Sequence, residues 1–550
     1  MDKNTIENIK KAHSLTNNKP DEYFVAYENI YKLLQKRVNV NFDKEYLVYY
    51  SESGEVTRFT YEEFIKKVYK LANYLLENDV RKEHRVGTFL HNHYDTVILY
   101  FACWCIGAVV VPVNVSEEPE RVNFIFKDSN TRLVFTLGMY DEKLKKAVHD
   151  LPGEIVNFET LDYSEFKDRV QMRQQVTRET EAMIVYTSGT TGNPKGVVLT
   201  QYNLMIDADG IAIWHKIYSE DVMMCVLPIH HVNGTVVTIM TTMYIGGKLI
   251  LNQKFQTDKF LQRLQDEKVK IVSVVPTLLQ FMIHSNEDAS KYNLESFSHI
   301  ICGAGPLTCE VARNFEEKFN LRIVHGYGLS ETTCYSCFIP IDLSEAEHYQ
   351  WQNGFGYPAI GIPIYWNEME IHNDKGQSQD ENVKGEIVIR GHNVMKYYFN
   401  NDNANKKTFE FGWFRSGDEG FFRFDRFKNK YFFITGRIKE LIIRGGVNIS
   451  TLEVDEVISQ CEFVRAGICV GFENDWYGEE VGALILLNEG VQPTEELKGK
   501  ILKYFRSKLP AYKSPKVIIF SDAIPVTSTG KYQRNKVKHL FSEFKTTQFK

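Results

Sequence analysis

The middle of the chain alternates short runs of β-branched residues with longer amphipathic stretches. The runs include residues 271–275 (IVSVV), 299–305 (HIICGAG) and 321–328 (LRIVHGYG), and the stretches PTLLQFMIH and TCEVARNFEEKF lie between them. This alternation is typical of a parallel sheet covered by helices on both faces. Because such sheets bind ligands at the carboxyl ends of their strands, we expect a site where GAGP and HGYG fall.

The pattern changes near residue 437. Beyond it, VRAGICVGF, VGALILL and KVIIF predict short strands, and LEVDEVISQ and TEELKGKILKYFRSKL predict helices. This mixture suits a small α+β domain. The stretch GRIKELIIRGG at the boundary contains three glycines, which permit unusual backbone angles. We therefore predict one domain over residues 1–436 and a second over residues 437–550, joined by a short hinge.

One uncharged stretch, residues 96–115, is about as long as a membrane-spanning helix. Gly107, Pro112 and the β-branched residues 109–111 divide it. The stretch therefore predicts a buried helix followed by a short buried strand, and we expect no transmembrane segment.

Composition limits the class of protein. Of 550 residues, 43% are hydrophobic and 25% are charged, which supplies a core and excludes a disordered or collagen-like chain. The net charge of −6 does not favour a nucleic-acid-binding protein. Residues 501–550 nevertheless hold eleven Lys and Arg against Asp522 and Glu543. This basic end is either a solvated face or a surface that covers a polyanionic small molecule.

The nine cysteines and the polar N-terminus favour reduced thiols in a cytoplasmic protein. Cys334 and Cys337 form one CxxC pair, but no second pair stands at a spacing suited to zinc. We interpret both as buried packing residues.

The strongest chemical signal is IVYTSGTTGNPKGVVLT, residues 184–200, in which two apolar strands flank a loop of glycines, hydroxyls and one lysine. Glycines let several backbone N–H groups approach an anion, hydroxyls add donors, and Lys195 adds charge. The loop is not a Walker A motif, because Pro194 precedes the lysine and Gly196 follows it. It therefore predicts a different kind of phosphate-binding loop.

Together with later segments, this loop resembles the signature of adenylate-forming enzymes, the superfamily of acyl-CoA synthetases, luciferases and peptide-synthetase adenylation domains. The other matching segments are HGYGLSETT, GEIVIRG, GWFRSGDEG, GRIKELIIRGGVNIS and PVTSTGKYQRNKV. The resemblance implies an α/β fold: a large N-terminal domain of stacked α/β sheets with a small β-barrel-like part, and a smaller mobile α+β C-terminal domain.

The resembled enzymes join a carboxylic acid to the α-phosphate of ATP, release pyrophosphate, and pass the acyl group to a thiol. The resemblance therefore implies ATP, Mg²⁺ and coenzyme A. It also assigns residues. Those that would contact the nucleotide are Thr187, Ser188, Gly189, Thr190, Thr191, Gly192 and Lys195 at the phosphates, Gly303, Ala304, Gly305, Pro306, Gly326, Tyr327 and Gly328 around the adenine and acyl sites, Ser330 at the α-phosphate, and Asp418 and Arg437 at the ribose.

Further roles follow from the same resemblance. Glu331 would hold Mg²⁺, and Lys531 would catalyse adenylate formation alone. Lys439 would be the hinge that brings the backbone of Gly445 and Gly446 to the thiol channel. His231 would lie beside the reacting carboxylate, with a buried structural histidine as the alternative.

The acid and the acceptor remain open at this stage. Residues 226–237, which line the acyl end in the resembled enzymes, contain no acidic residue to meet an ammonium group, so amino-acid activation is disfavoured. Fatty, aryl and short polar acids all stay compatible, and we expect an acid of the fatty or aryl type. Coenzyme A is the favoured thiol; loading of a separate carrier protein, luciferase-like oxidation and a catalytically silent nucleotide-binding scaffold are the alternatives. A monomer and a homodimer are both compatible with the sequence.

Overall fold

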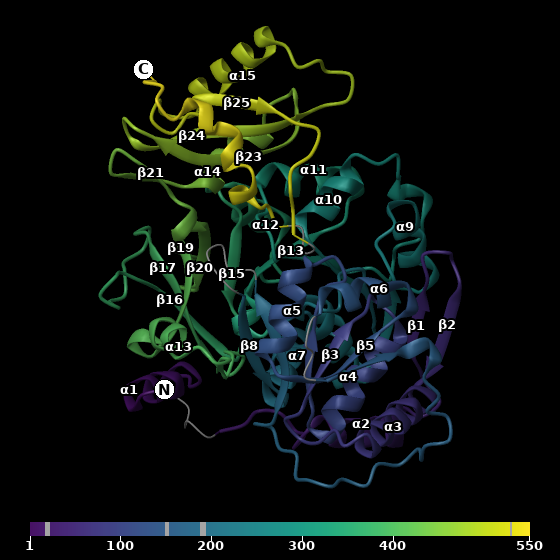
Figure 1. Ribbon diagram of the computed structural model, residues 1–550. Coiled ribbons are helices and arrows are strands. Elements are labelled where there is room, and N and C mark those ends of the chain that lie inside the picture. The colour runs from purple at the N-terminus through teal and green to yellow at the C-terminus, as the bar shows by residue number, and fades with distance from the viewer. Residues whose placement is uncertain (17–21, 149–152, 188–193, 528–530, 550) are drawn as a thin grey trace.

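The computed structural model describes residues 1–16, 22–148, 153–187, 194–527 and 531–549. Its strands form three sheets, and helices cover the two larger ones (Figure 1). The described helices of the body are α1 (Lys3–Ala12), α2 (Ile30–Asn41), α3 (Tyr61–Glu77), α4 (Tyr94–Ile106), α5 (Pro119–Asp128), α6 (Gly138–Ala147), α7 (Gln201–Trp214), the π-helix η2 (Asn233–Met240), α8 (Thr241–Ile245), α9 (Thr257–Asp266), α10 (Pro276–Ile283), α11 (Cys309–Phe319), α12 (Glu345–Asn353) and α13 (Asp402–Thr408).

The largest sheet contains thirteen of the described strands and joins a parallel half to an antiparallel half. Its order is β16 (Asn367–His372), β17 (Gly385–Gly391), β19 (Phe414–Phe424), β20 (Lys430–Arg437), β15 (Ala359–Pro363), β14 (Cys337–Phe338), β13 (Ile323–Tyr327), β12 (His299–Cys302), β11 (Ile271–Val274), β9 (Val222–Cys225), β10 (Lys248–Asn252), β1 (Glu45–Tyr50) and β2 (Val56–Thr60). The run from β13 to β1 is parallel and buried except at the ends of β1, β9 and β10, as its β-branched runs predict. Strands β15, β16, β17, β19 and β20 are antiparallel and form the other end of this sheet, and β14 lies between β15 and the parallel strand β13.

The second sheet contains seven of the described strands. Its order is β18 (Tyr397–Tyr398), β8 (Lys195–Thr200), β7 (Glu181–Thr187), β4 (Val109–Pro112), β3 (Arg85–Phe89), β5 (Thr131–Thr136) and β6 (Glu154–Asn157). Helix α4 and strand β4 occupy the apolar stretch 96–115, so the predicted buried helix and strand are both confirmed. Gly107 ends α4 in the left-handed region, with φ of 77°, where glycine carries no steric penalty. In the part of the chain that the structure describes, no helix is both long and apolar enough to cross a membrane.

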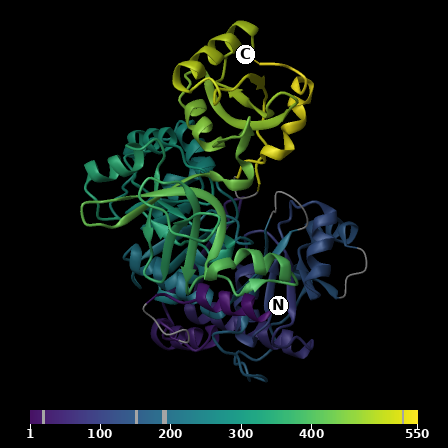
Figure 2. The same cartoon turned by 90° about the vertical axis from the view of Figure 1, so that its left-hand side faces the viewer.

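The C-terminal part forms a separate α+β domain at one end of the body, above α10 and α11 (Figures 1 and 2). Its described elements are β21 (Ile442–Arg444), β22 (Val447–Ile449), α14 (Thr451–Ser459), β23 (Val464–Asn474), β24 (Gly478–Leu487), α15 (Glu495–Lys508), β25 (Val517–Phe520) and the 3-10 turns η7 (Arg534–Lys536) and η8 (Lys538–Phe544). It has its own core, in which Ile458, Ile485, Ile501, Phe505 and Ile518 pack together. The chain enters it from β20 through the short 3-10 turn η6 (Ile438–Glu440).

Candidate active site

Two adjoining cavities, of about 550 Å³ and 270 Å³, lie between the body and the C-terminal domain. Ala304, Gly328 and Lys531 line both of them. Ala304 and Gly328 follow the carboxyl ends of β12 and β13, which is where the alternating pattern places a ligand. Predicted residues that line at least one cavity are Thr187, His231, Ala304, Gly305, Pro306, Gly326, Tyr327, Gly328, Ser330, Asp418, Arg437 and Lys531.

Asp418 lies on β19 and is fully buried at the edge of the smaller cavity. The hydroxyl of Tyr327 donates to its Oδ2 over 2.6 Å. Arg437 Nε lies 2.8 Å from Oδ1, but out of line for a hydrogen bond, so Oδ1 is a buried acceptor without a hydrogen-bond donor among the described residues. Asp418 raises the pKa of Arg437, which therefore stays charged. A ligand hydroxyl at Oδ1 would satisfy this carboxylate.

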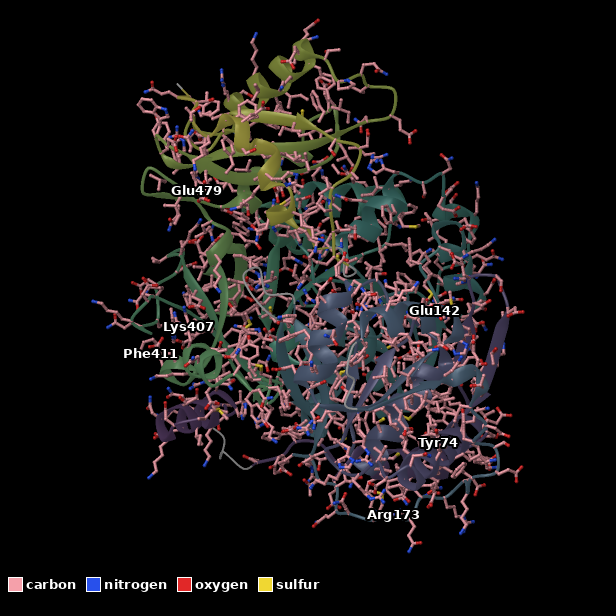
Figure 3. The ribbon with its side chains drawn as sticks, viewed as in Figure 1. Tyr74, Glu142, Arg173, Lys407, Phe411 and Glu479 are labelled. Carbon is pink, nitrogen blue, oxygen red and sulfur yellow. The ribbon has the colours of Figure 1, made fainter. Side chains whose placement is uncertain are left out.

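Lys195 and Glu331 meet around Tyr398, a residue that no sequence motif indicates. The Tyr398 hydroxyl donates to Glu331 Oε1 over 2.7 Å, and the Lys195 ammonium lies 4.7 Å from the centre of the Tyr398 ring. Burial lowers the pKa of Lys195, while Glu331 raises it and Lys407 and Lys439 lower it further. Figure 3 shows Lys407, one of these neighbouring cations, on α13. The arrangement gathers positive charge beside one carboxylate, as a polyphosphate with a bound cation requires.

Thr187 and Lys195 are paired across β7 and β8, at the two ends of the predicted phosphate-binding loop. The other predicted loop residues, Ser188, Gly189, Thr190, Thr191 and Gly192, lie outside the described residues.

Lys531 reaches the cavities because the segment after it is anchored within the C-terminal domain. Arg534, on η7, is buried and forms an ion pair with Asp455 of α14, and it donates to the carbonyl of Cys469 over 2.8 Å. Burial is the main cause that lowers the pKa of Lys531; Arg437 lowers it further, and Asp418 and Glu331 raise it. Lys531 therefore lies at the same two cavities as predicted residues from Thr187 to Arg437, which stand about 100 to 340 positions earlier in the chain.

His231 lines the larger cavity, and its ring centre lies 4.4 Å from that of His230. Burial, His230 and Lys531 lower the pKa of His231 well below its usual value. Burial lowers the pKa of His230 to about 4. Both imidazoles are therefore neutral near pH 7.

Three of the predicted glycines are needed for close packing of the protein itself, and not only to leave room for a ligand. A Cβ on Gly328 would lie 1.8 Å from the carbonyl oxygen of Cys334, so the chain can turn back over β13 only without a side chain there. A Cβ on Gly303 would lie 2.5 Å from the Tyr335 hydroxyl, and one on Gly326 would lie 2.3 Å from the Phe338 ring. The room beside Gly303 and Gly326 is thus taken by aromatic side chains of the protein itself.

Six of the predicted residues that the structure describes line neither cavity: Lys195, Gly303, Glu331, Lys439, Gly445 and Gly446. Lys439 is exposed on η6, and Gly445 and Gly446 are exposed at the tip of the β21–β22 hairpin. Glu479, at the edge of the C-terminal sheet in Figure 3, holds this hairpin by accepting from the N–H of Ile443 over 2.7 Å. Gly445 and Gly446, assigned to the second chemical step, therefore stand outside both cavities, whereas Lys439 is close enough to Lys195 to lower the pKa of that lysine.

The site fits the nucleotide and the cation that the motifs imply. Glu331 Oε1 accepts the Tyr398 hydrogen bond, and the carboxylate forms no ion pair within the described residues. No cluster of three or more His, Cys, Asp or Glu suited to a metal occurs in the described ranges. A cation at Glu331 would therefore take its other oxygen ligands from phosphates and water, as Mg²⁺ commonly does.

Comparisons with known proteins agree with this site. The family model of the AMP-binding enzymes matches residues 34–399. The model of the AMP-binding enzyme C-terminal domain matches residues 453–531. The chain therefore belongs to the AMP-binding enzyme family, and the predicted membership of the adenylate-forming superfamily is confirmed. Within that superfamily it groups with the AMP-forming acyl-CoA synthetases.

Three relatives illustrate the range of this group. The chain is 32% identical to an oxalate–CoA ligase of Arabidopsis thaliana, over 82% of this chain and 87% of that protein. It is 27% identical to a long-chain-fatty-acid–CoA ligase of Bacillus subtilis, over 87% of this chain and 90% of that protein. O-succinylbenzoate coenzyme A synthetase of Bacillus subtilis, solved with ATP and a magnesium ion, superposes with a TM-score of 0.79 at 26% identity, over 92% of this chain and 99% of that one.

Proposed function

We propose that this protein is an ATP-dependent acid–CoA ligase that forms an acyl-adenylate and then an acyl-CoA. The observation that carries the proposal is the convergence of Lys531 from the C-terminal domain with Ser330, Ala304 and His231 from the body in one cavity. A cation from one domain facing hydroxyl and backbone groups of the other suits a reaction in which negative charge develops at a phosphate.

In the first step, a carboxylate oxygen of the acid forms a bond to the α-phosphorus of ATP, and the bond from that phosphorus to pyrophosphate breaks. Asp418 would accept from the ribose hydroxyls, and Tyr327 would lie against the adenine. Lys531 would neutralise charge on both the carboxylate and the α-phosphate. Because two anions must approach each other, most of the acceleration comes from positioning and charge neutralisation.

Lys195 and the loop after Thr187 would hold the β and γ phosphates, and Glu331 would bind Mg²⁺. When bound, the cation supplies positive charge to the phosphate oxygens. Tyr398 keeps the Glu331 carboxylate in place through its hydrogen bond of 2.7 Å. Neutral His231 can lie beside the carboxylate of the acid without adding charge.

In the second step, the sulfur of coenzyme A attacks the acyl carbon, the bond from that carbon to the adenylate oxygen breaks, and AMP leaves. The thiol proton passes to solvent or to a nearby base. We propose that residues 437–550 turn about Lys439 between the steps, withdrawing Lys531 and bringing Gly445 and Gly446 to the thiol. The exposed positions of these glycines leave them free to form new contacts.

The test is pyrophosphate release measured with ATP, Mg²⁺ and a panel of carboxylic acids, with and without coenzyme A, followed by mass analysis of the products. Acid-dependent pyrophosphate release together with an acyl-CoA product is expected. Release without acyl-CoA would favour a carrier-protein loader or a luciferase-like oxidase. Absence of release with every acid would favour a silent nucleotide-binding scaffold.

A further inference from the structure

Two buried residues in the lining of the larger cavity contact each other through polar groups. Asn233 and Tyr335 line the cavity and are only 6% and 1% exposed. Asn233 Nδ2 donates to the Tyr335 hydroxyl over 3.2 Å, and Ser273 Oγ donates to Asn233 Oδ1 over 2.7 Å. Asn233 also begins the π-helix η2, a helix type that is frequent at functional sites.

Tyr335 cannot easily move out of this position. Its N–H donates to Asp207 Oδ2 over 3.4 Å, and its carbonyl accepts from Asn393 Nδ2 over 2.8 Å. Its ring lies 4.5 Å from the Phe338 ring, centre to centre. Displacing the ring would leave the Asn233 amide without its partner, which typically costs about 1–3 kcal/mol for a buried group.

The same ring takes the space that small residues at the strand ends would otherwise leave for an acyl chain. The Tyr335 hydroxyl lies 2.5 Å from where a Cβ on Gly303 would be, and a ring carbon lies 2.9 Å from where one on Gly326 would be. An alkyl chain that entered from the His231 side would therefore meet a fixed amide and hydroxyl. Contact with the amide and the hydroxyl would add little binding free energy for an alkyl chain, because these polar groups would lose their hydration or their hydrogen-bond partners.

We propose that Tyr335 and Asn233 form a polar end wall that selects short carboxylic acids carrying an oxygen function at the far end, such as hydroxy, oxo or second carboxylate groups. The inference rests on the proposed ligase function and deepens it. A tyrosine hydroxyl can accept from Asn233 and donate to a substrate oxygen at the same time. Two of the three relatives named above act, by their names, on a short diacid and on long-chain acids, so sequence similarity alone does not decide between these classes of acid.

The test compares acids of matched length in the full-length protein by kcat/KM for pyrophosphate release. The panel contains butanoate, 4-hydroxybutanoate, succinate, octanoate and dodecanoate. The wild type should prefer the polar-ended acids over butanoate by at least about tenfold, since an unsatisfied buried donor discriminates strongly. Octanoate and dodecanoate should be poorer still.

Two variants separate the hydroxyl from the ring. Tyr335→Phe keeps the ring, so it should lose most of the preference for polar ends while the limit on length remains. Tyr335→Ala opens the space beside Gly303 and should raise kcat/KM for octanoate relative to succinate. Tyr349→Phe, at an exposed tyrosine on α12, is the control and should change neither ratio.

The outcomes are distinct. A wild-type preference for octanoate or dodecanoate, or an unchanged polar-to-alkyl ratio in Tyr335→Phe, would overturn the end wall and leave the ligase function standing. No pyrophosphate release by the wild type with any acid, of this panel or the broader one above, would overturn both. If Tyr335→Ala does not fold, the ratio in Tyr335→Phe decides alone.

Discussion

Lys531 lines both cavities together with Ala304 and Gly328 of the body, and it comes from the smaller domain. We expect Lys531→Ala to slow adenylate formation by roughly 10²–10³-fold, the loss found when one group that stabilises developing charge is removed. Thioester formation from pre-made acyl-adenylate should keep its rate. Lys536→Ala is the control, because Lys536 lines the same larger cavity but is exposed on η7. Equal losses in both half-reactions would contradict the assignment.

The charge state of Lys531 adds a pH profile to the same experiment. Burial lowers its pKa, so the ammonium loses its proton at a lower pH than a free lysine does. The rate of adenylate formation should therefore fall as the pH rises through that lowered pKa. Thioester formation from the pre-made adenylate should not follow the same curve between pH 7 and 10.

Site residues that stand in a recognisable motif could be predicted from the sequence. The residues that contact them in the folded protein could not. Glu331, Asp418 and Lys531 each stand in a recognisable segment, so the resemblance names them. Tyr398 carries no such signal, because its contacts to Lys195 and Glu331 join positions far apart in the chain. The role of Tyr335 could not be predicted for a related reason, because only the folded structure shows that its ring lies against Gly303.

At the scale of elements, the β21–β22 hairpin carries a test of the second half-reaction. Gly446 has a φ of 83°, and no atom lies within 4 Å of the place that a Cβ would take, so alanine there meets backbone strain but no clash. We expect Gly446→Ala to slow thioester formation at least several-fold and to leave adenylate formation unchanged. Gly490→Ala is a matched control, since Gly490 is also exposed, has a φ of 80° and lies in the same domain.

Strain of this kind costs about 1 kcal/mol in either variant, so both should show a similar small loss of thermal stability. A rate loss shared by Gly490→Ala would mean that strain, and not the hairpin, slows the reaction. An unchanged rate of thioester formation in Gly446→Ala would show that the β21–β22 hairpin does not form part of the thiol channel.

Long periodic elements follow from the sequence, and irregular ones do not. Helix α4 and strand β4 could be predicted because glycine, proline and β-branched residues divide one apolar stretch. The π-helix η2 could not, because its apolar composition equally suits an α-helix. Strand β23 runs on to Asn474, beyond the apolar pattern, because its polar end pairs with the start of β24.

At the scale of the whole molecule, the basic C-terminal end is less free than its composition suggests. Lys513 pairs with Glu453, Arg534 with Asp455, Lys538 with Glu479 and Lys545 with Glu473, all within the C-terminal domain. Much of the local charge excess therefore stabilises the domain or is screened at its surface. Lys531, which lines both cavities, is the basic residue of this segment best placed to meet a nucleotide.

The orientation of the two domains is held in part by Glu456. This residue of α14 is buried, and its Oε2 accepts from the N–H of Cys309, the first residue of α11 in the body, over 2.9 Å. The first N–H groups of a helix have no partner within it, and a carboxylate at this end also interacts favourably with the helix dipole. Thr308 satisfies the N–H of Val311, so the two domains share the capping of α11.

We expect Glu456→Ala to weaken this domain contact by about 1 kcal/mol, which corresponds to about a fivefold shift between orientations. Adenylate formation should slow by up to this factor, because Lys531 spends less time at the cavities, while thioester formation should be unchanged or faster. Small-angle scattering of the free protein should report a changed mean radius of gyration. Glu453→Ala is the control, since Glu453 lies on the same helix and pairs with Lys513 inside the C-terminal domain. An unchanged radius with equal losses in both half-reactions would show that Glu456 supports the fold of α14 and not the domain orientation.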